Sequence, residues 1–109
     1  MALEQLAAGK LLEHAQHSRC PVLAVIVRPN GTPSRSLLAS FAALEESALD
    51  GIEAVQVDMD EDPEVMNQLR VAYEPELILF DQGRIIERTD GDMNSRAVAS
   101  FIKHALSLR

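Results

Sequence analysis

The segment Arg28–Ser36, which reads RPNGTPSRS, is placed like a catalytic loop. It follows an apolar run, contains a turn and a proline, and leads into a helical pattern. It holds no cysteine, histidine or carboxylate, so hydroxyl groups are its only candidate nucleophiles. Ser34 would need a neighbouring base to act as one, and the matching loops of the chain contain no histidine. We therefore interpret Ser34 as an N-terminal residue of the helix that follows.

Cys20 is the single cysteine of the chain, so no disulfide can form within it. It lies directly before the apolar run and outside the loop, without a second thiol to resolve a mixed disulfide. Free cysteines are usually buried and inert, whereas a reactive thiol needs an exposed, electropositive setting. We favour the structural interpretation and keep thiol chemistry at Cys20 as the alternative.

No set of residues predicts a metal site. The acidic run 58–62 has the carboxylate spacing of a calcium loop, but Pro63 stands where that loop needs glycine and Leu69 where it needs glutamate. His14 and His17 are three residues apart on a helical pattern, yet no third ligand accompanies them. We expect neither a metal nor another cofactor.

The net charge of the chain excludes some classes of function. The 109 residues include 17 acidic and 10 basic side chains, for a formal net charge of −7. A general nucleic-acid binder needs a basic surface that neutralises phosphates, so we exclude that class. Glu4, Lys10 and Glu13 interrupt the N-terminal apolar pattern, so we expect neither a signal peptide nor membrane attachment. These features predict a single domain over residues 1–109, located in the cytoplasm.

Apolar periodicity predicts the elements that position the loop. Helical spacing recurs in four groups of residues: Leu3, Leu6, Ala7 and Leu11; Leu37, Phe41, Leu44 and Ala48; Val65, Met66 and Leu69; and Val98, Phe101, Ile102 and Ala105. Strand-like runs lie at residues 21–27, at 52–60 and in two arms within 76–89, which Gln82-Gly83 joins as a hairpin turn.

Local signals mark the ends of the predicted helices. We expect Thr32 to cap the second helix, with Pro33 in its first turn, and Asp50-Gly51 to stop it. Asp62-Pro63 repeats the cap-and-proline start, and Asn94 is the expected cap of the last helix. The order α-β-α-β-α-β-β-α gives parallel strands with right-handed crossovers plus an antiparallel hairpin. The predicted class is α/β, with a mixed sheet of four or five strands flanked by helices.

Four segments resemble the thioredoxin family in order and spacing, from about Pro21 to Leu106: PVLAVIVRPNGTPSR, VDMDEDPEVMNQLRV, EPELILFDQGRII and DGDMNSRAVASFIKHAL. Thioredoxins carry Pro-Trp-Cys-Gly-Pro-Cys after their central strand. Against that motif the chain has Pro29, Asn30, Gly31, Thr32, Pro33 and Ser34, so both cysteines are replaced. Val25 stands where the family has a buried aspartate. Disulfide exchange requires a thiolate, so the resemblance implies a redox-inactive member, similar in general plan to the hydrogenase-accessory HyaE/HupG-type proteins.

The resemblance also implies a cis proline opposite the loop, at Pro75. In thioredoxins the backbone beside this proline pairs with an extended substrate peptide, and that pairing needs no sulfur. The candidate contact residues are Arg28, Arg35, Tyr73, Glu74, Pro75 and Glu76. We expect the arginines and glutamates to form the two rims of a polar groove that sets charge preference; scattered surface charge is the alternative.

The sequence therefore favours an accessory or chaperone-like factor that binds a protein or an extended peptide and lacks dithiol chemistry. Two other classes stay open. One is a divergent thiol-dependent oxidoreductase that uses Cys20, which a thiol-reactivity assay would reveal. The other is a structural homodimer or assembly subunit, which the mass in solution would reveal.

Overall fold

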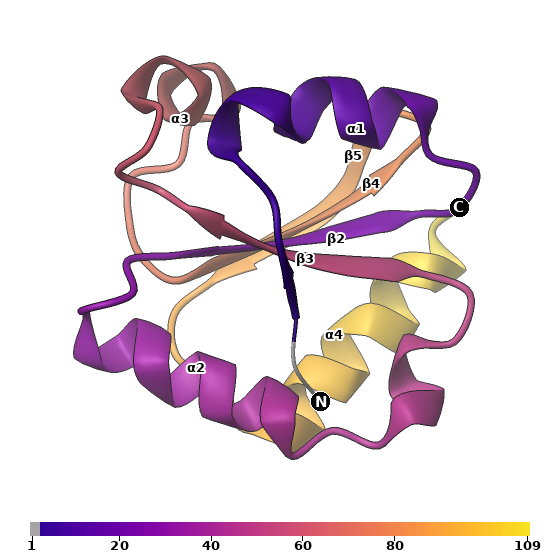
Figure 1. Cartoon of the computed structure of the whole chain (residues 1–109). Helices are drawn as coiled ribbons and strands as arrows, with labels where there is room; N and C mark the ends of the chain where they lie inside the picture. Colours follow the sequence, from indigo (N-terminus) through magenta and orange to yellow (C-terminus); the bar gives the residue numbers. More distant parts are fainter. Residues whose placement is uncertain (1–2) are drawn as a thin grey trace.

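The computed structural model describes residues 3–109 as a mixed β-sheet with helices on both faces (Figure 1). The strands are β1 (Glu4–Gln5), β2 (Val22–Val27), β3 (Glu53–Asp58), β4 (Glu76–Asp81) and β5 (Arg84–Asp90). The α-helices are α1 (Leu11–His17), α2 (Thr32–Ala42), α3 (Pro63–Leu69) and α4 (Ser95–Ser107), and the short 3-10 helices are η1 (Ala8–Lys10) and η2 (Glu46–Leu49). The predicted α/β class with a mixed sheet is confirmed, and the sheet has five strands in the order β1-β3-β2-β4-β5.

The central strand β2 organises the sheet. It pairs parallel with β3 and antiparallel with β4, and β4 pairs antiparallel with β5. All six of its residues are buried, because helices cover both faces of the sheet at this strand. A strand of this kind reads as a continuous apolar run, which is what the sequence has at residues 21–27.

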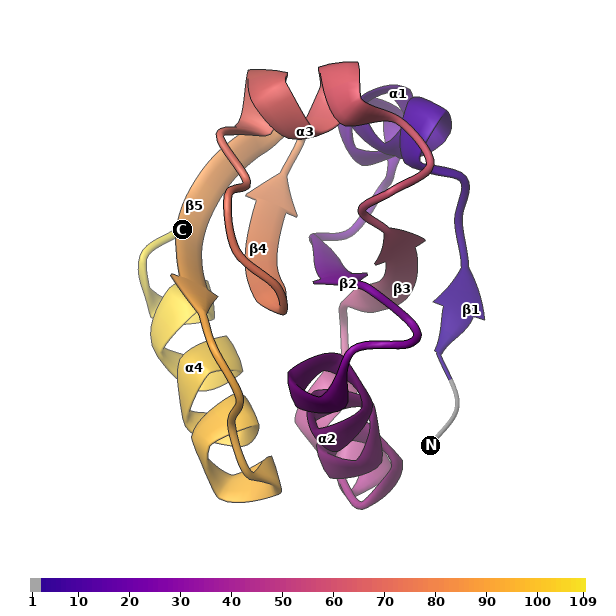
Figure 2. The ribbon, with the colours of Figure 1, turned by 90° about the vertical axis from the view of Figure 1, so that its left-hand side faces the viewer.

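Two apolar cores fill the space between the sheet and its helices. Helices α1 and α3 cover one face and α2 and α4 the other (Figures 1 and 2). Phe80 lies in the core below α1 and α3, and Phe41 lies in the core against α2 and α4. Both are essentially inaccessible to water, and the burial of each such side chain contributes about 1.5–3 kcal/mol to folding. The sheet is therefore a rigid frame for its connecting loops.

The strand directions bring several loops to one end of the sheet. β2, β3 and β5 finish at this end and β4 starts there, because Ile26 pairs with Glu76 and Glu76 pairs with Asp90. Figure 2 looks onto this end, where the β2–α2, α3–β4 and β5–α4 connections emerge. The loop that follows β2 is the segment RPNGTPSRS, which starts at Arg28. We call this the loop end of the sheet.

The N-terminal segment differs from the predicted helix. Glu4–Gln5 pairs parallel with β3, and the helical part begins only at Ala8. Leu3 packs against the α2 and α4 core, whereas Leu6 packs against the α1 and α3 core. A helix would place residues three apart on one side, but a strand passing the sheet edge sends them to opposite faces. The chain order therefore begins with a strand.

The second helix also departs from the prediction at both ends. Gly31 is its N-cap, and Thr32 is the first helical residue without a capping hydrogen bond. The helix ends at Ala42 and not near Asp50-Gly51, because the N–H of Leu44 bonds the carbonyl three residues back and the chain then extends. The Leu44 side chain still packs against the core of this face, so apolar residues at helical spacing extend beyond the end of the helix.

The predicted starts of α3 and α4 and the predicted hairpin turn are confirmed. The Asp62 side chain caps α3 by accepting the N–H of Val65, and Asn94 caps α4 by accepting that of Ala97. Gln82 and Gly83 both have positive φ at the hairpin turn, as a two-residue turn of this hand requires. No helix in residues 3–109 is long and apolar enough to cross a membrane.

Candidate functional site

Ser34 joins two segments at the loop end of the sheet. Its Oγ accepts the backbone N–H of Arg28 at 2.9 Å and donates to the Oε2 of Glu74. The residue is fully buried, so its hydroxyl has no access to a substrate. The position of the second thioredoxin cysteine thus holds a polar link between the β2–α2 loop and the α3–β4 loop. This arrangement supports a structural role for Ser34.

Gly31 leaves the space that the Glu74 carboxylate occupies. A Cβ atom added to Gly31 would lie nearest to Oε1 of Glu74, and only 2.7 Å from Oε2 and 2.9 Å from Cδ, closer than such atoms approach in proteins. Gly31 caps α2, whose first turn contains no acidic residue. The carboxylate from a distant loop therefore supplies negative charge at the positive end of this helix. A side chain at the position of the first thioredoxin cysteine would displace it.

The segment before β4 presents free main-chain groups. The Glu74–Pro75 peptide bond is cis, and the carbonyl of buried Pro75 accepts the N–H of Gly91 at 2.9 Å. The backbone N–H and C=O of Glu74 make no hydrogen bond with any residue from 3 to 109. Tyr73 is 71% exposed, an unusual degree for an aromatic side chain. An extended chain could pair with this backbone and contact the ring.

Arg28 lies on the expected rim but is already engaged. Its Nε and Nη2 donate to the two carboxylate oxygens of Asp60 at 3.0 and 3.2 Å. The hydrogen bond and the charge of Asp60 raise the pKa of Arg28 above its ordinary value. Sequence reasoning missed this partner because the two residues lie 32 positions apart. Arg35, in contrast, is exposed on α2 and has no ion-pair partner in the described part of the chain.

The structure does not place Glu76 on the rim with Glu74, which corrects the prediction. Glu76 is only 5% exposed and forms an ion pair with Arg88 of β5. The Arg88 Nη1 also donates to the carbonyl of Leu69 at 2.7 Å, so the pair ties two strands to the end of α3. Burial raises the pKa of Glu76 above its ordinary value, and the hydrogen bond and charge of Arg88 counteract that shift.

Cys20 is far from the loop. It is partly buried before the start of β2, with its Sγ 3.8 Å from the hydroxyl of Ser18. The six residues of β2 separate it from the loop end by about 20 Å at roughly 3.3 Å per residue. Val25, at the position of the buried acid, is fully buried among apolar neighbours. Neither residue places a thiol or a carboxyl group at the loop.

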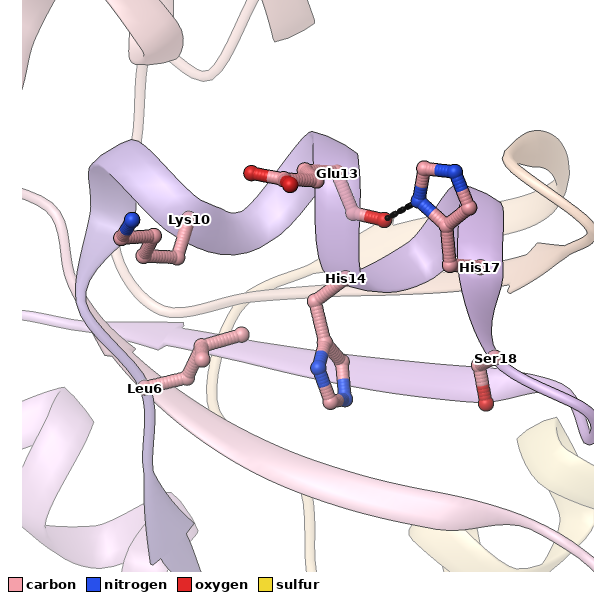
Figure 3. Close-up of a pocket in the computed structure, with 6 residues that line it drawn as sticks. All are labelled: Leu6, Lys10, Glu13, His14, His17 and Ser18. Carbon is pink, nitrogen blue, oxygen red and sulfur yellow. Dashed lines mark hydrogen bonds between the residues drawn. The ribbon is translucent and has the colours of Figure 1, made fainter.

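The two N-terminal histidines belong to a different region. A cavity of about 590 Å³ lies beside α1, on the face opposite α2, and Figure 3 shows the residues that line it. His14 Nε2 is 2.8 Å from Oε1 of Glu53, and His17 Nδ1 donates to the carbonyl of Glu13 at 3.0 Å. In residues 3–109, no three His, Cys, Asp or Glu side chains are grouped so that they could hold a metal ion.

This architecture and loop arrangement define a thioredoxin fold. The family model for thioredoxin matches residues 6–104, so the chain belongs to the thioredoxin family. The crystal structure of chloroplastic thioredoxin z is similar, with a TM-score of 0.79 over 98% of this chain and 96% of that chain, at 20% sequence identity. A comparison with curated proteins finds no match. This member has one cysteine and therefore lacks the paired cysteines of the family motif.

Replacement of Arg88 by methionine is expected to destabilise the fold in a pH-dependent way. The variant leaves the buried Glu76 carboxylate without its cation, which raises its folded pKa further above the unfolded value. This loss of stability is absent at a pH where Glu76 is protonated in both the folded and the unfolded protein. It grows as the pH rises from the pKa of Glu76 in the unfolded protein through its pKa in the folded protein. Urea unfolding at pH 7 should show a loss of about 2–3 kcal/mol, since the arginine is partly exposed.

The same variant should lose less stability near pH 4 than at pH 7. Glu76→Gln in the Arg88→Met background is the matched control, because it removes the unpaired charge and should restore part of the loss at neutral pH. An Arg88→Met loss that stays equal at the two pH values would show that Arg88 acts through packing and its carbonyl contacts alone.

Proposed function

We propose that this protein is a redox-inactive member of the thioredoxin family that binds an extended segment of another protein. The binding surface comprises the β2–α2 loop, residues 28–35, and the Tyr73–Pro75 segment. The observation that carries the proposal is the Glu74 carboxylate beside Gly31 and Ser34, on a segment whose main chain stays available. The protein would act as a cytoplasmic accessory or chaperone-like factor without a cofactor.

The residues at the loop support the proposed lack of dithiol chemistry. Thiol–disulfide exchange proceeds through a thiolate and a mixed disulfide, and a second thiol releases the product. Gly31 has no side chain, and the hydroxyl of Ser34 is buried and bonded on both sides. Cys20 lies at the other end of β2. The loop therefore keeps the position of the family's active site without its reactive atoms.

The proposed binding depends on hydrogen bonds to the main chain. An unpaired N–H and C=O at the edge of a rigid segment can accept an added strand, and neighbouring side chains then select the sequence. The free groups of Glu74 provide the pairing, and exposed Tyr73 provides a large apolar contact of the kind that dominates interfaces. The carbonyl of Pro75 is not available because Gly91 holds it.

The protein should leave insulin reduction by dithiothreitol at its uncatalysed rate, because no paired thiols exist to carry the exchange. The measurement is the turbidity of reduced insulin over time, with an authentic dithiol thioredoxin as the positive control. A strong acceleration that Cys20→Ser abolishes would contradict the proposal and favour the thiol-dependent oxidoreductase.

Binding of an unfolded chain should protect amides at the loop end of the sheet. We expect slower hydrogen exchange in residues 28–34 and 73–76 when the protein is mixed with reduced and carboxamidomethylated lysozyme, an extended basic probe without thiols. The expected protection reflects strand addition at Glu74 and covering of the adjacent loop. Protection confined to α4, or exchange that the probe leaves unchanged, would contradict the proposed surface.

A further inference from the structure

One oxygen of Glu74 remains available at the centre of the proposed binding surface. Oε2 accepts the hydroxyl of Ser34, whereas Oε1 bonds no residue in the described part of the chain. The side chain is partly exposed, and it lies over Gly31, which adds no side chain of its own. A group arriving from a bound segment therefore meets a carboxylate oxygen that can accept a hydrogen bond.

The arginines near the Glu74 carboxylate form no ion pair with it. Both side-chain hydrogen bonds of Arg28 go to Asp60, although Arg28 also interacts with the charge of Glu74. Arg88 is committed to Glu76 and to the end of α3. Arg35 is the remaining cation of the loop, and it extends from the exposed side of α2. Glu74 interacts electrostatically with Arg28 and with the N-terminus of α2, but it forms no ion pair in residues 3–109, so its carboxylate can still attract a cation from outside the molecule.

The whole loop end of the sheet carries a net negative charge, of the same sign as Glu74. The segments 28–35, 58–62, 70–76 and 90–92 contain eight acidic and three basic residues. Arg88 neutralises one of these acids, Glu76, and the remaining excess of acids is more than half of the formal net charge of −7. A field of this sign concentrates positive partners and repels negative ones before contact. Tyr73, next to Glu74 in the chain, adds an exposed ring on which the alkyl stem or the cation of a basic side chain can pack.

We propose that the segment bound at this surface carries a lysine or arginine whose cation is received by the free Oε1 of Glu74 beside the ring of Tyr73. The inference rests on the proposed peptide-binding function and adds its specificity: a basic extended segment. Main-chain pairing at Glu74 supplies the anchor, and the carboxylate selects the side chain. A charge-assisted hydrogen bond of this kind is among the stronger polar contacts.

The test selects ligands from a display library of random nine-residue peptides with the intact protein as bait. We expect lysine or arginine to be enriched at one position of the selected sequences. Affinities of the best peptide and of its Lys→Gln and Lys→Glu (or Arg→Gln and Arg→Glu) forms are then measured by fluorescence anisotropy. Glu74→Gln, which keeps an acceptor for Ser34, should weaken the basic peptide about tenfold and leave the Gln peptide nearly unchanged.

Two protein variants separate the possible failures. Tyr73→Ala should weaken the basic and the Gln peptide alike, since it tests the surface and not the charge. Glu46→Gln removes an equal charge from exposed η2, which precedes β3 at the other end of the sheet, and should change neither affinity. The inference would be overturned if the selected peptides are enriched in acidic residues, show no charge preference, or bind Glu74→Gln as tightly as the original protein. If the affinity of these peptides still falls with Tyr73→Ala, the proposed function stands. No selected peptide, or none sensitive to Tyr73→Ala, would overturn both.

Discussion

The contact between Glu74 and Ser34 is the constraint on which the rest of the site depends. It joins residues 40 positions apart and holds the β2–α2 loop against the segment that starts β4. Ser34 also accepts the N–H of Arg28, so the hydroxyl satisfies the end of β2 as well. A buried hydroxyl that lost these partners would carry a desolvation cost of about 1–3 kcal/mol. The contact therefore links the shape of the loop to the position of the proposed binding edge.

The replacement of both cysteines removes the thiols from the loop end of the sheet. In the thioredoxin family the loop end of the sheet combines a reactive pair with a surface for extended chains. Here Gly31 and Ser34 replace the pair, and the Glu74 carboxylate fills the vacated space. The frame is unaffected because the two apolar cores do not include the loop. A thioredoxin fold can bind an extended peptide without exchanging disulfides, since only disulfide exchange needs the thiolates.

Most of the frame could be predicted from the sequence, because local rules determine it. The apolar run of β2, the Asp62 cap and the hairpin turn depend on neighbours in the chain. The sequence predicts a helix in place of β1, because two residues give no period and the spacing of Leu3 and Leu6 matches that of a helix. Contacts within the site join loops far apart in sequence, and no spacing rule connects them. Glu76 had a usable signal: strand alternation places it on the face of Ile78 and Phe80.

A double-mutant cycle of Gly31→Ala and Glu74→Ala tests most directly whether the carboxylate occupies the vacated space. The free energy of unfolding in urea is measured for the four proteins, and the cycle cancels the helix-cap preference for glycine, which acts in both backgrounds. The account predicts that Gly31→Ala is about 1 kcal/mol more destabilising with Glu74 present, because the new Cβ displaces the carboxylate from Ser34. Equal effects in the two backgrounds would contradict it.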